Sequence, residues 1–289
     1  MPVVCAAILP HGWDLIPVLS DDAGGALATQ AAMISVGEMF RDSGVEAIVL
    51  AGPHGIRVDS AICIADVARA AGRIERGSRV AELNVPCDRS LIASIGSAAR
   101  ARDVPVAMAG YAGNRADQSA SPMDWGAMVP LWFLGNGNLH AQGTGSVLAA
   151  PPAQESVPPV VLITPSRALP RAAMVEFGRA VGDACAADSR RIGFVASCDW
   201  SHVHRADGPY GYDPIAPEMD GKIVAAIHAD TLPALIDLPQ DDVERAAIDG
   251  LWQTLMLTGV REIQPLPPLK LLSYEAPTYF GMIVAVSCG

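Results

Sequence analysis

The amino-acid sequence predicts an α/β fold in three layers, with a mostly parallel central sheet between two layers of helices. Three observations lead to this prediction: short runs that are apolar throughout, segments with helical periodicity, and the alternation of the two along most of the chain. Continuously apolar runs are typical of parallel strands that are buried on both faces. Because no shift in composition divides the 289 residues, we expect a single domain over residues 1–289.

The first half of the chain alternates strands with helices. Apolar strands are expected at residues 3–9 and 47–51, and the helix between them, residues 25–41, ends at Ser43-Gly44 because glycine commonly terminates helices. Further strands are expected at residues 60–65, near 80–85 and at 104–108, with a helix at 89–102.

The second half begins with an apolar segment and then loses its regular pattern. Residues 135–159 are rich in Gly, Ala and Pro, and we expect a mobile surface loop or an insertion in which His140 is exposed. Later strands are expected at residues 160–164 and 192–197, and helices at 171–187, 217–229 and 241–258. Residues 269–274 and 280–286 are expected to close the chain as an antiparallel strand pair.

The composition argues against several classes of protein. A net charge of −11 at pH 7 disfavours a nucleic-acid-binding surface, which needs a basic patch. No run approaches the roughly 18 apolar residues of a membrane-spanning helix, and the N-terminus has no charged segment of the kind that opens a signal peptide. The six cysteines are scattered without a CxxC pair, so we expect reduced core cysteines and a cytoplasmic protein.

Two histidines follow apolar strands in the same local sequence. His11 and His54 each stand in a Pro-His-Gly triplet directly after an expected strand. The carboxyl ends of parallel strands meet at one edge of an open α/β sheet, and ligands bind there. Two imidazoles at that edge indicate a metal site, with two loop histidines that bond to backbone as the alternative.

A site of this kind needs a third protein ligand, and a carboxylate would complete the set that binds non-haem Fe(II). Asp249 is the best candidate because it is a lone carboxylate in an otherwise apolar helical segment, where an unpaired charge would be costly. Glu244 is the alternative. His202, just after a strand, suits general acid–base chemistry, whereas His204 faces the same side only if the segment stays extended.

Five motifs follow one another along nearly the whole chain: Pro10-His11-Gly12, Gly52-Pro53-His54-Gly55, Asp124-x-Gly126-x-x-Val129-Pro130-Leu131, Ser197-x-Asp199-x-Ser201-His202 and Pro209-Tyr210-Gly211-Tyr212-Asp213. Together they resemble the class III extradiol ring-cleaving dioxygenases, and among them the catalytic subunits of protocatechuate 4,5-dioxygenase and its relatives.

The resemblance implies Fe(II), with zinc or manganese as alternatives, held by His11, His54 and a carboxylate. It implies an aromatic substrate that binds at this metal as a catecholate together with O₂, and a ring-opened semialdehyde as the product. His202 would take a phenolic proton. We also expect a homo-oligomer, and the resemblance leaves open a small partner subunit over the active site.

Two positions depart from the family pattern. The family usually has Asp-His-Gly where this chain has Asp124-Trp125-Gly126, so a large ring replaces an imidazole, for which His204 or Tyr212 would compensate. The family carboxylate is usually Glu, and here Asp249 aligns with it. Beyond the metal ligands, the expected site residues are His202, Asp124 and His204 in catalysis and Trp125, Tyr212 and Trp13 in substrate binding.

Two other functions fit the same motifs. A metal-binding protein of the same superfold, similar to the Memo branch, would lack ring-cleaving activity, and Trp125 slightly favours it. A zinc hydrolase would use the same ligands on amides or esters without O₂. The substrate itself is not named by the sequence; the arginines in expected rim loops that could bind a carboxylate are Arg57, Arg115, Arg167 and Arg205.

Overall fold

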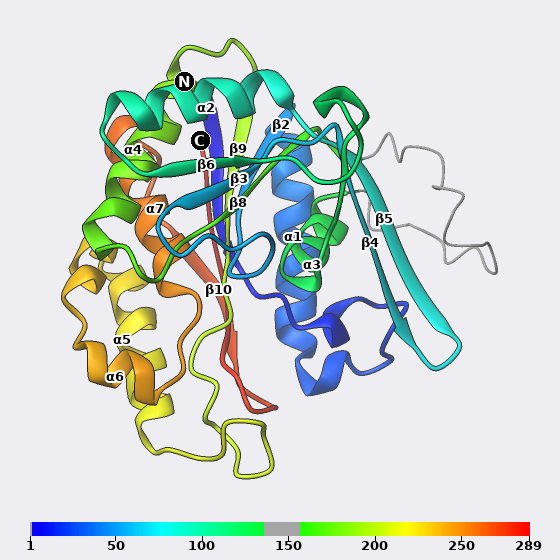
Figure 1. Cartoon of the computed structure of the whole chain (residues 1–289). Helices are drawn as coiled ribbons and strands as arrows, with labels where there is room; N and C mark the ends of the chain where they lie inside the picture. Colours follow the sequence, from blue (N-terminus) through cyan, green and yellow to red (C-terminus); the bar gives the residue numbers. More distant parts are fainter. Residues whose placement is uncertain (1, 136–156) are drawn as a thin grey trace.

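An eight-stranded sheet forms the centre of the computed structural model, which describes residues 2–135 and 157–289 (Figure 1). In chain order its strands are β1 (Val3–Leu9), β2 (Ala47–Ala51), β3 (Ile62–Ala65), β6 (Val106–Ala109), β8 (Val160–Thr164), β9 (Ile192–Ser197), β10 (Lys270–Glu275) and β11 (Met282–Cys288). In space they stand in the order β10-β11-β1-β9-β2-β8-β3-β6.

The directions of these strands confirm a mostly parallel sheet with an antiparallel C-terminal pair. β1, β9, β2 and β8 run parallel to one another, and β6 runs parallel to β3. β11 pairs antiparallel with both β1 and β10. β3 also pairs antiparallel with β8, a reversal that the sequence pattern did not indicate. Every residue of β1, β2 and β9 is buried, as expected for continuously apolar central strands.

Helices cover both faces of the sheet and complete the three predicted layers (Figure 1). On one face α1 (Leu27–Asp42) packs against α3 (Trp125–Leu134). On the other face α4 (Arg171–Ala186) packs against α7 (Leu251–Ile263) and α2 (Arg89–Ala101). The remaining helices are α5 (Ile215–His228), α6 (Gln240–Arg245) and the short 3₁₀ segments Trp13–Leu15, Ala23–Gly25, Ala116–Gln118 and Leu232–Asp237.

A second, smaller sheet contains β5 (Arg79–Pro86), β4 (Arg69–Arg76) and β7 (Ala120–Pro122), in that spatial order. The sequence indicated only the segment that lies within β5. β4 consists mainly of Arg, Ala, Gly and Glu, which have low strand propensity, so its extended form depends on pairing with β5 along its whole length.

The single helix expected at residues 241–258 is wrong. The chain forms α6, leaves the helix at residues 246–250, and starts again as α7. Ala247 has a positive φ of 50°, a conformation that lies outside the right-handed helical region. A Cβ at Gly250 would lie 2.5 Å from Cβ of Cys198, so glycine allows this break to approach the end of β9. Asp249 therefore lies in a loop between two helices and not inside one.

The expectation of six reduced cysteines is also wrong, because Cys5 and Cys288 form a disulfide. β1 and β11 are antiparallel neighbours, and their register places these two residues opposite each other with Cα atoms 4.2 Å apart. A separation of 283 residues hides this pairing from any local motif. The free cysteines among the described residues, all buried, are Cys63, Cys87, Cys185 and Cys198.

The segment expected to be a loop or an insertion, residues 135–159, lies mostly outside the described residues, and so does His140. Within the described part of the chain, no helix has the length and apolar character needed to cross a membrane.

Candidate metal centre

The two Pro-His-Gly histidines meet because of the order of the strands. β1 and β2 flank β9 and both run parallel to it, so their carboxyl ends lie at the same edge of the sheet. His11 follows β1 and His54 follows β2. Their ring centroids are 5.3 Å apart, and the rings are nearly perpendicular.

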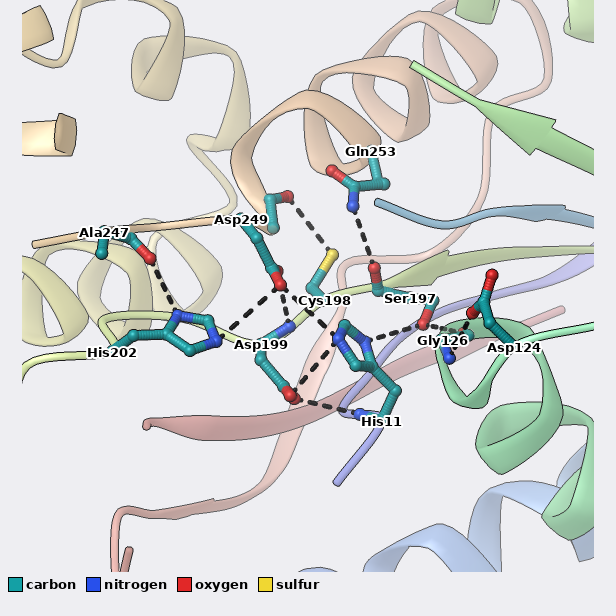
Figure 2. A network of polar contacts seen from close by, with 11 residues as sticks. His11, Asp124, Gly126, Ser197, Cys198, Asp199, His202, Ala247, Asp249 and Gln253 are labelled. Atoms are coloured by element: carbon teal, nitrogen blue, oxygen red, sulfur yellow. Dashed lines mark hydrogen bonds and ion pairs between the residues drawn. The ribbon is translucent and has the colours of Figure 1, made fainter. Parts of the chain in front are cut away.

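The loop between α6 and α7 brings Asp249 to the same point (Figure 2). Oδ2 of Asp249 lies 3.5 Å from Nε2 of His11. One potential ligand atom from each of His11, His54 and Asp249 lies within 4.8 Å of the other two. Two imidazoles and a carboxylate are typical ligands of non-haem Fe(II), and zinc and manganese also bind such donors. These three residues therefore fit a divalent transition metal.

His11 is held in one orientation by the end of β9. Its Nδ1 lies 3.0 Å from Oγ of Ser197, and that hydroxyl donates its hydrogen to the carbonyl of Gly126. The hydroxyl must then accept from His11, which places the imidazole proton on Nδ1. The lone pair of Nε2 is left facing the carboxylates, as a metal ligand requires.

A second buried carboxylate, Asp199, lies beside the donor group. Its Oδ2 is 3.3 Å from Nε2 of His11, and its Oδ1 accepts a hydrogen bond from the backbone N–H of His11 at 3.0 Å. The backbone N–H of Asp199 in turn donates to Oδ1 of Asp249 at 3.0 Å. In the sequence Asp199 stands out only as part of a motif; its position directly after a buried strand was the available signal.

The two carboxylates dominate the electrostatics of the site. Burial lowers the pKa of His11, but the charges of Asp199 and Asp249 outweigh it and raise this pKa to about 9. Burial raises the pKa of Asp199 above its usual value. For Asp249 burial acts in the same direction, but the charge and hydrogen bond of His11 and the charges of His202 and Arg167 together outweigh it and lower the pKa. A negative potential that holds a proton so firmly also favours a divalent cation.

His202 lies on the other side of Asp249, with its Nε2 3.9 Å from Oδ2 of that residue. Its Nδ1 is 2.8 Å from the carbonyl oxygen of Ala247, and its backbone N–H donates to the carbonyl of Ala246. Because a carbonyl only accepts, Nδ1 carries the proton, and Nε2 of the neutral ring is free to take another. The helix break thus positions both Asp249 and His202.

A cavity of about 660 Å³ opens over these residues. Its wall includes His11, His54, Asp199, His202 and Asp249. The wall also contains aromatic side chains, which are Trp13, Trp125, Tyr210, Tyr279 and Phe280. Phe280 stacks on the ring of His202 with centroids 5.7 Å apart. A cavity of this size with converging polar groups on one side matches a small-molecule site.

Of the next three expected site residues, two tryptophans line the cavity and one aspartate caps a helix. Trp125 lines the cavity, with its ring centroid 4.7 Å from that of His54. Trp13 also lines it, beneath the guanidinium of Arg76. Asp124, expected in catalysis, caps α3: its Oδ1 accepts the backbone N–H of Gly126 at 2.6 Å, and it is not part of the cavity wall.

His204 and Tyr212, expected to compensate for the imidazole that Trp125 replaces, are not part of the wall of this cavity. Nε2 of His204 is 2.8 Å from Oδ2 of the fully buried Asp220, which also accepts from the hydroxyl of Tyr274. Tyr212 bridges His204 through the backbone and is 61% exposed. The chain bends at His202, so this segment is not extended; His202 lines the cavity, whereas His204 bonds to Asp220.

The remaining candidates are one alternative metal ligand and four arginines, and their contacts show which of them reach the site. Glu244 is exposed on α6, where it accepts a hydrogen bond from Gln240, so it lies outside the donor group. Arg115 and Arg205 form ion pairs with Asp117 and Asp207 next to them in the chain. Arg57 and Arg167 line the cavity.

Comparison with known proteins shows a family to which this sequence is similar along most of its length. The family model described as the catalytic LigB subunit of aromatic ring-opening dioxygenase matches residues 9–285. The chain is 25% identical over 230 residues to the protein CA_C1420 of Clostridium acetobutylicum, a match that covers 79% of this chain. The chain spans only 45% of the length of that relative.

The fold also has a solved counterpart. The crystal structure of the uncharacterized protein JW3007 from Escherichia coli K12 aligns with a TM-score of 0.59, over 98% of this chain and 99% of that one. The two sequences are 14% identical, so the likeness concerns the fold alone.

Proposed function

We propose, from the premise that the chain belongs to the LigB family of catalytic subunits of aromatic ring-opening dioxygenases, that it is an Fe(II)-dependent extradiol dioxygenase. Its substrate would be a catechol-type or aminophenol-type aromatic, and its second substrate O₂. The observation that carries the proposal is the group of His11, His54 and Asp249 in the wall of a cavity that also has aromatic side chains, with His202 beside it.

His11, His54 and Asp249 would hold the metal. Fe(II) bound there supplies a Lewis acid and an electron path between an aromatic diolate and O₂. The protein contributes orientation: Ser197 fixes the ring of His11, and the backbone of Asp199 fixes the carboxylate of Asp249. Three protein ligands would leave other positions of the metal open, and all three residues line the cavity from which substrates would reach it.

His202 is the acid–base residue of the proposal. His202 lines the cavity, and its Nε2, 3.9 Å from Oδ2 of Asp249, would take the proton of a phenolic hydroxyl while its Nδ1–H stays bonded to Ala247. Phe280 packs on this ring and limits its rotation. The aromatic walls would hold a planar ring and exclude water from it.

The first test is oxygen uptake by the iron-loaded protein over a broad panel of catechols and aminophenols. His11→Ala is expected to lose bound iron and activity together, whereas His202→Ala keeps iron and loses about 100- to 10,000-fold in rate. His228→Ala is the matched control, because His228 is a histidine at the end of α5, outside the cavity wall. No oxygen uptake with any substrate, with iron occupancy measured, would contradict the proposal.

A second candidate is supported by Trp125, whose ring lies against His54 where the family usually has an imidazole. In that case the chain binds a metal in the same site without cleaving rings, as a Memo-like protein would. Stoichiometric metal without oxygen uptake would select this candidate. Bound zinc with hydrolysis of amides or esters would select the hydrolase.

Homo-oligomerisation, a small partner subunit and a cytoplasmic location stay predictions. The Cys5–Cys288 disulfide weighs against the last of these, since such bonds are typical of oxidising compartments.

A further inference from the structure

A fully buried carboxylate contacts the segment that carries His202. Asp220, in the middle of α5, has none of its surface exposed and is not part of the cavity wall. Its Oδ1 accepts a hydrogen bond from the backbone N–H of Ser201 at 3.0 Å. Its Oδ2 lies 2.8 Å from Nε2 of His204 and accepts from the hydroxyl of Tyr274 at 3.0 Å. Two of these three partners therefore flank His202 in the chain.

The same carboxylate contacts the loop that carries Phe280. A side chain at Gly281 would overlap Oδ2 of Asp220, so glycine allows the chain to pass directly against the carboxylate. The N–H of Gly281 donates to the carbonyl of Ser201 at 3.0 Å, which joins this loop to the segment of His202. Phe280, the residue before Gly281, stacks on the ring of His202. Asp220 therefore contacts both of the segments whose side chains form this stack.

The orientation of the His202 ring depends on the backbone on both sides of it. The ring is directed by the bond from its Nδ1 to the carbonyl of Ala247 and by the stack on Phe280. Both contacts hold only while the two segments keep their places. An acid–base group acts over hydrogen-bond distances, and a displacement of about 1 Å can cost about 100-fold in rate. The group that fixes these segments therefore bears on the reaction rate.

A buried carboxylate is well suited to fix them. Burial of an unpaired charge is costly, so the fold is stable only when the donors around the carboxylate stay in position. The carboxylate comes from α5, and its partners come from the segment after β9 and from β10. None of these residues is a candidate metal ligand, so the network can orient His202 without taking part in metal binding.

We infer that Asp220 is a positioning residue, which holds His202 against Phe280 in the orientation that the proposed acid–base chemistry needs. It acts through the three hydrogen bonds that it accepts. This inference rests on the proposed function and deepens it. His204, which the sequence placed in catalysis, then acts as a partner of Asp220 and does not contact the substrate.

The first experiment measures kcat, KM and bound iron by oxygen uptake in Asp220→Asn, which keeps the size of the side chain and removes its charge. The kcat is expected to fall about 10- to 100-fold, while KM and iron content stay at their wild-type values. Tyr274→Phe removes a single hydroxyl and decides the matter if Asp220→Asn does not fold; its kcat should fall about 2- to 10-fold. His204→Gln keeps a donor for Asp220 and should recover most of the activity that His204→Ala loses.

The matched control is Asp88→Asn, because Asp88 is another buried carboxylate that caps a helix away from the cavity. This variant should lose stability and keep its kcat. If Asp220→Asn and Tyr274→Phe likewise lose only stability, Asp220 supports the fold alone and the inference is overturned. A loss of iron or a rise in KM that accounts for the loss of activity would also overturn it.

The second experiment needs no substrate. Long-range ¹H–¹⁵N NMR of the zinc-loaded protein reports which ring nitrogen of His202 carries the proton, and the loss of a signal in His202→Gln assigns it. The wild-type protein should show the Nδ1–H tautomer that the carbonyl of Ala247 selects. Asp220→Asn and Tyr274→Phe should add the second tautomer, whereas Asp88→Asn should not.

The two experiments separate the inference from the proposed function. If no catechol supports oxygen uptake but Asp220→Asn changes the tautomer of His202, the proposed function fails while the positioning by Asp220 stands. If ring cleavage occurs and neither Asp220→Asn nor Tyr274→Phe changes kcat or the His202 signal, the inference fails while the proposed function stands.

Discussion

Oγ of Ser197 lies 3.0 Å from Nδ1 of His11, and the same hydroxyl donates to the carbonyl of Gly126. This one side chain joins the end of β9, the start of α3 and a ligand of the candidate metal (Figure 2). Since the hydroxyl must accept from His11, it selects the tautomer whose Nε2 binds metal.

Replacing Ser197 by Ala should therefore weaken metal binding without removing a ligand. The expected loss is about 10- to 100-fold in affinity for Fe(II) or zinc, because His11 loses both its orientation and its tautomer preference. Competition with a chromophoric chelator measures it. Ser287→Ala is the control, because Ser287 is a similarly buried serine that bonds to the carbonyl of Pro267. Wild-type affinity in Ser197→Ala would show that the hydroxyl does not orient the ligand.

Trp125→His should raise the rate of ring cleavage. The ring of Trp125 lies 4.7 Å from that of His54, so an imidazole at this position would face the reacting groups and supply a proton donor. An increase in kcat of about 10-fold or more on a neutral catechol is expected, measured as oxygen uptake. Trp125→Phe keeps an apolar ring and should stay near the wild-type rate. A rate for Trp125→His no higher than that of Trp125→Phe would contradict the assignment.

Asp88 should make the stability of the fold depend on pH. Its carboxylate caps α2 through the backbone N–H of Leu91 and pairs with Arg190. Burial opposes ionisation, but the hydrogen bonds to Leu91 and Ser90 and the pairing with Arg190 outweigh it and lower the pKa of Asp88. Because the folded pKa is below the unfolded value of about 3.9, this contribution is full above that pH and is lost as pH falls through the lowered folded value.

The matching experiment is urea denaturation of Asp88→Ala at several pH values. The free energy of unfolding should drop by about 0.5 to 2 kcal/mol at neutral pH, and the difference from wild type should shrink as the solution becomes strongly acidic. Asp88→Asn keeps a capping oxygen and should lose less at neutral pH. A difference that does not change with pH would show that the charge of Asp88 contributes nothing.

Reducing the Cys5–Cys288 disulfide should destabilise the protein, because the bond closes nearly the whole chain into one loop. The expected cost is about 2 to 4 kcal/mol, measured by denaturation with and without a reductant. In the double variant Cys5→Ala with Cys288→Ala the reductant should have no effect. The contradicting result would be alkylation of Cys5 and Cys288 in protein that was never reduced, detected by mass spectrometry.

The elements that sequence patterns predicted well are those whose burial is uniform. The expected strands at residues 160–164 and 192–197 coincide with β8 and β9, because a strand buried on both faces must be apolar throughout. The helix break at 246–250 was missed because it contains the apolar residues Ala246, Ala247 and Ile248, which continue the spacing of apolar residues between the flanking helices. β4 was missed because its residues have low strand propensity, and its extended form depends on pairing with β5.

Among site residues, local sequence was enough for the histidines that come within a few residues of the end of a central strand. His11, His54 and His202 all lie at the edge that the strand pattern predicts, and all three line the cavity. Asp124 and His204 also follow the expected motifs, yet one caps α3 and the other bonds to Asp220. The direction of a side chain in a loop depends on contacts from distant segments, which a motif does not record.

Local sequence patterns are sufficient to predict the class of fold, the edge of the sheet where ligands bind, and the two histidines of the candidate metal group. These features follow from the burial of strands and the positions of strand ends, which short stretches of sequence record. Long-range packing decides that Asp249 and not Glu244 joins them, that Asp199 lies beside them, that Cys5 meets Cys288, and that Arg57 and Arg167 share one cavity. Each of these depends on segments far apart in the chain, brought together by the order of strands in the sheet and by a helix break at Gly250.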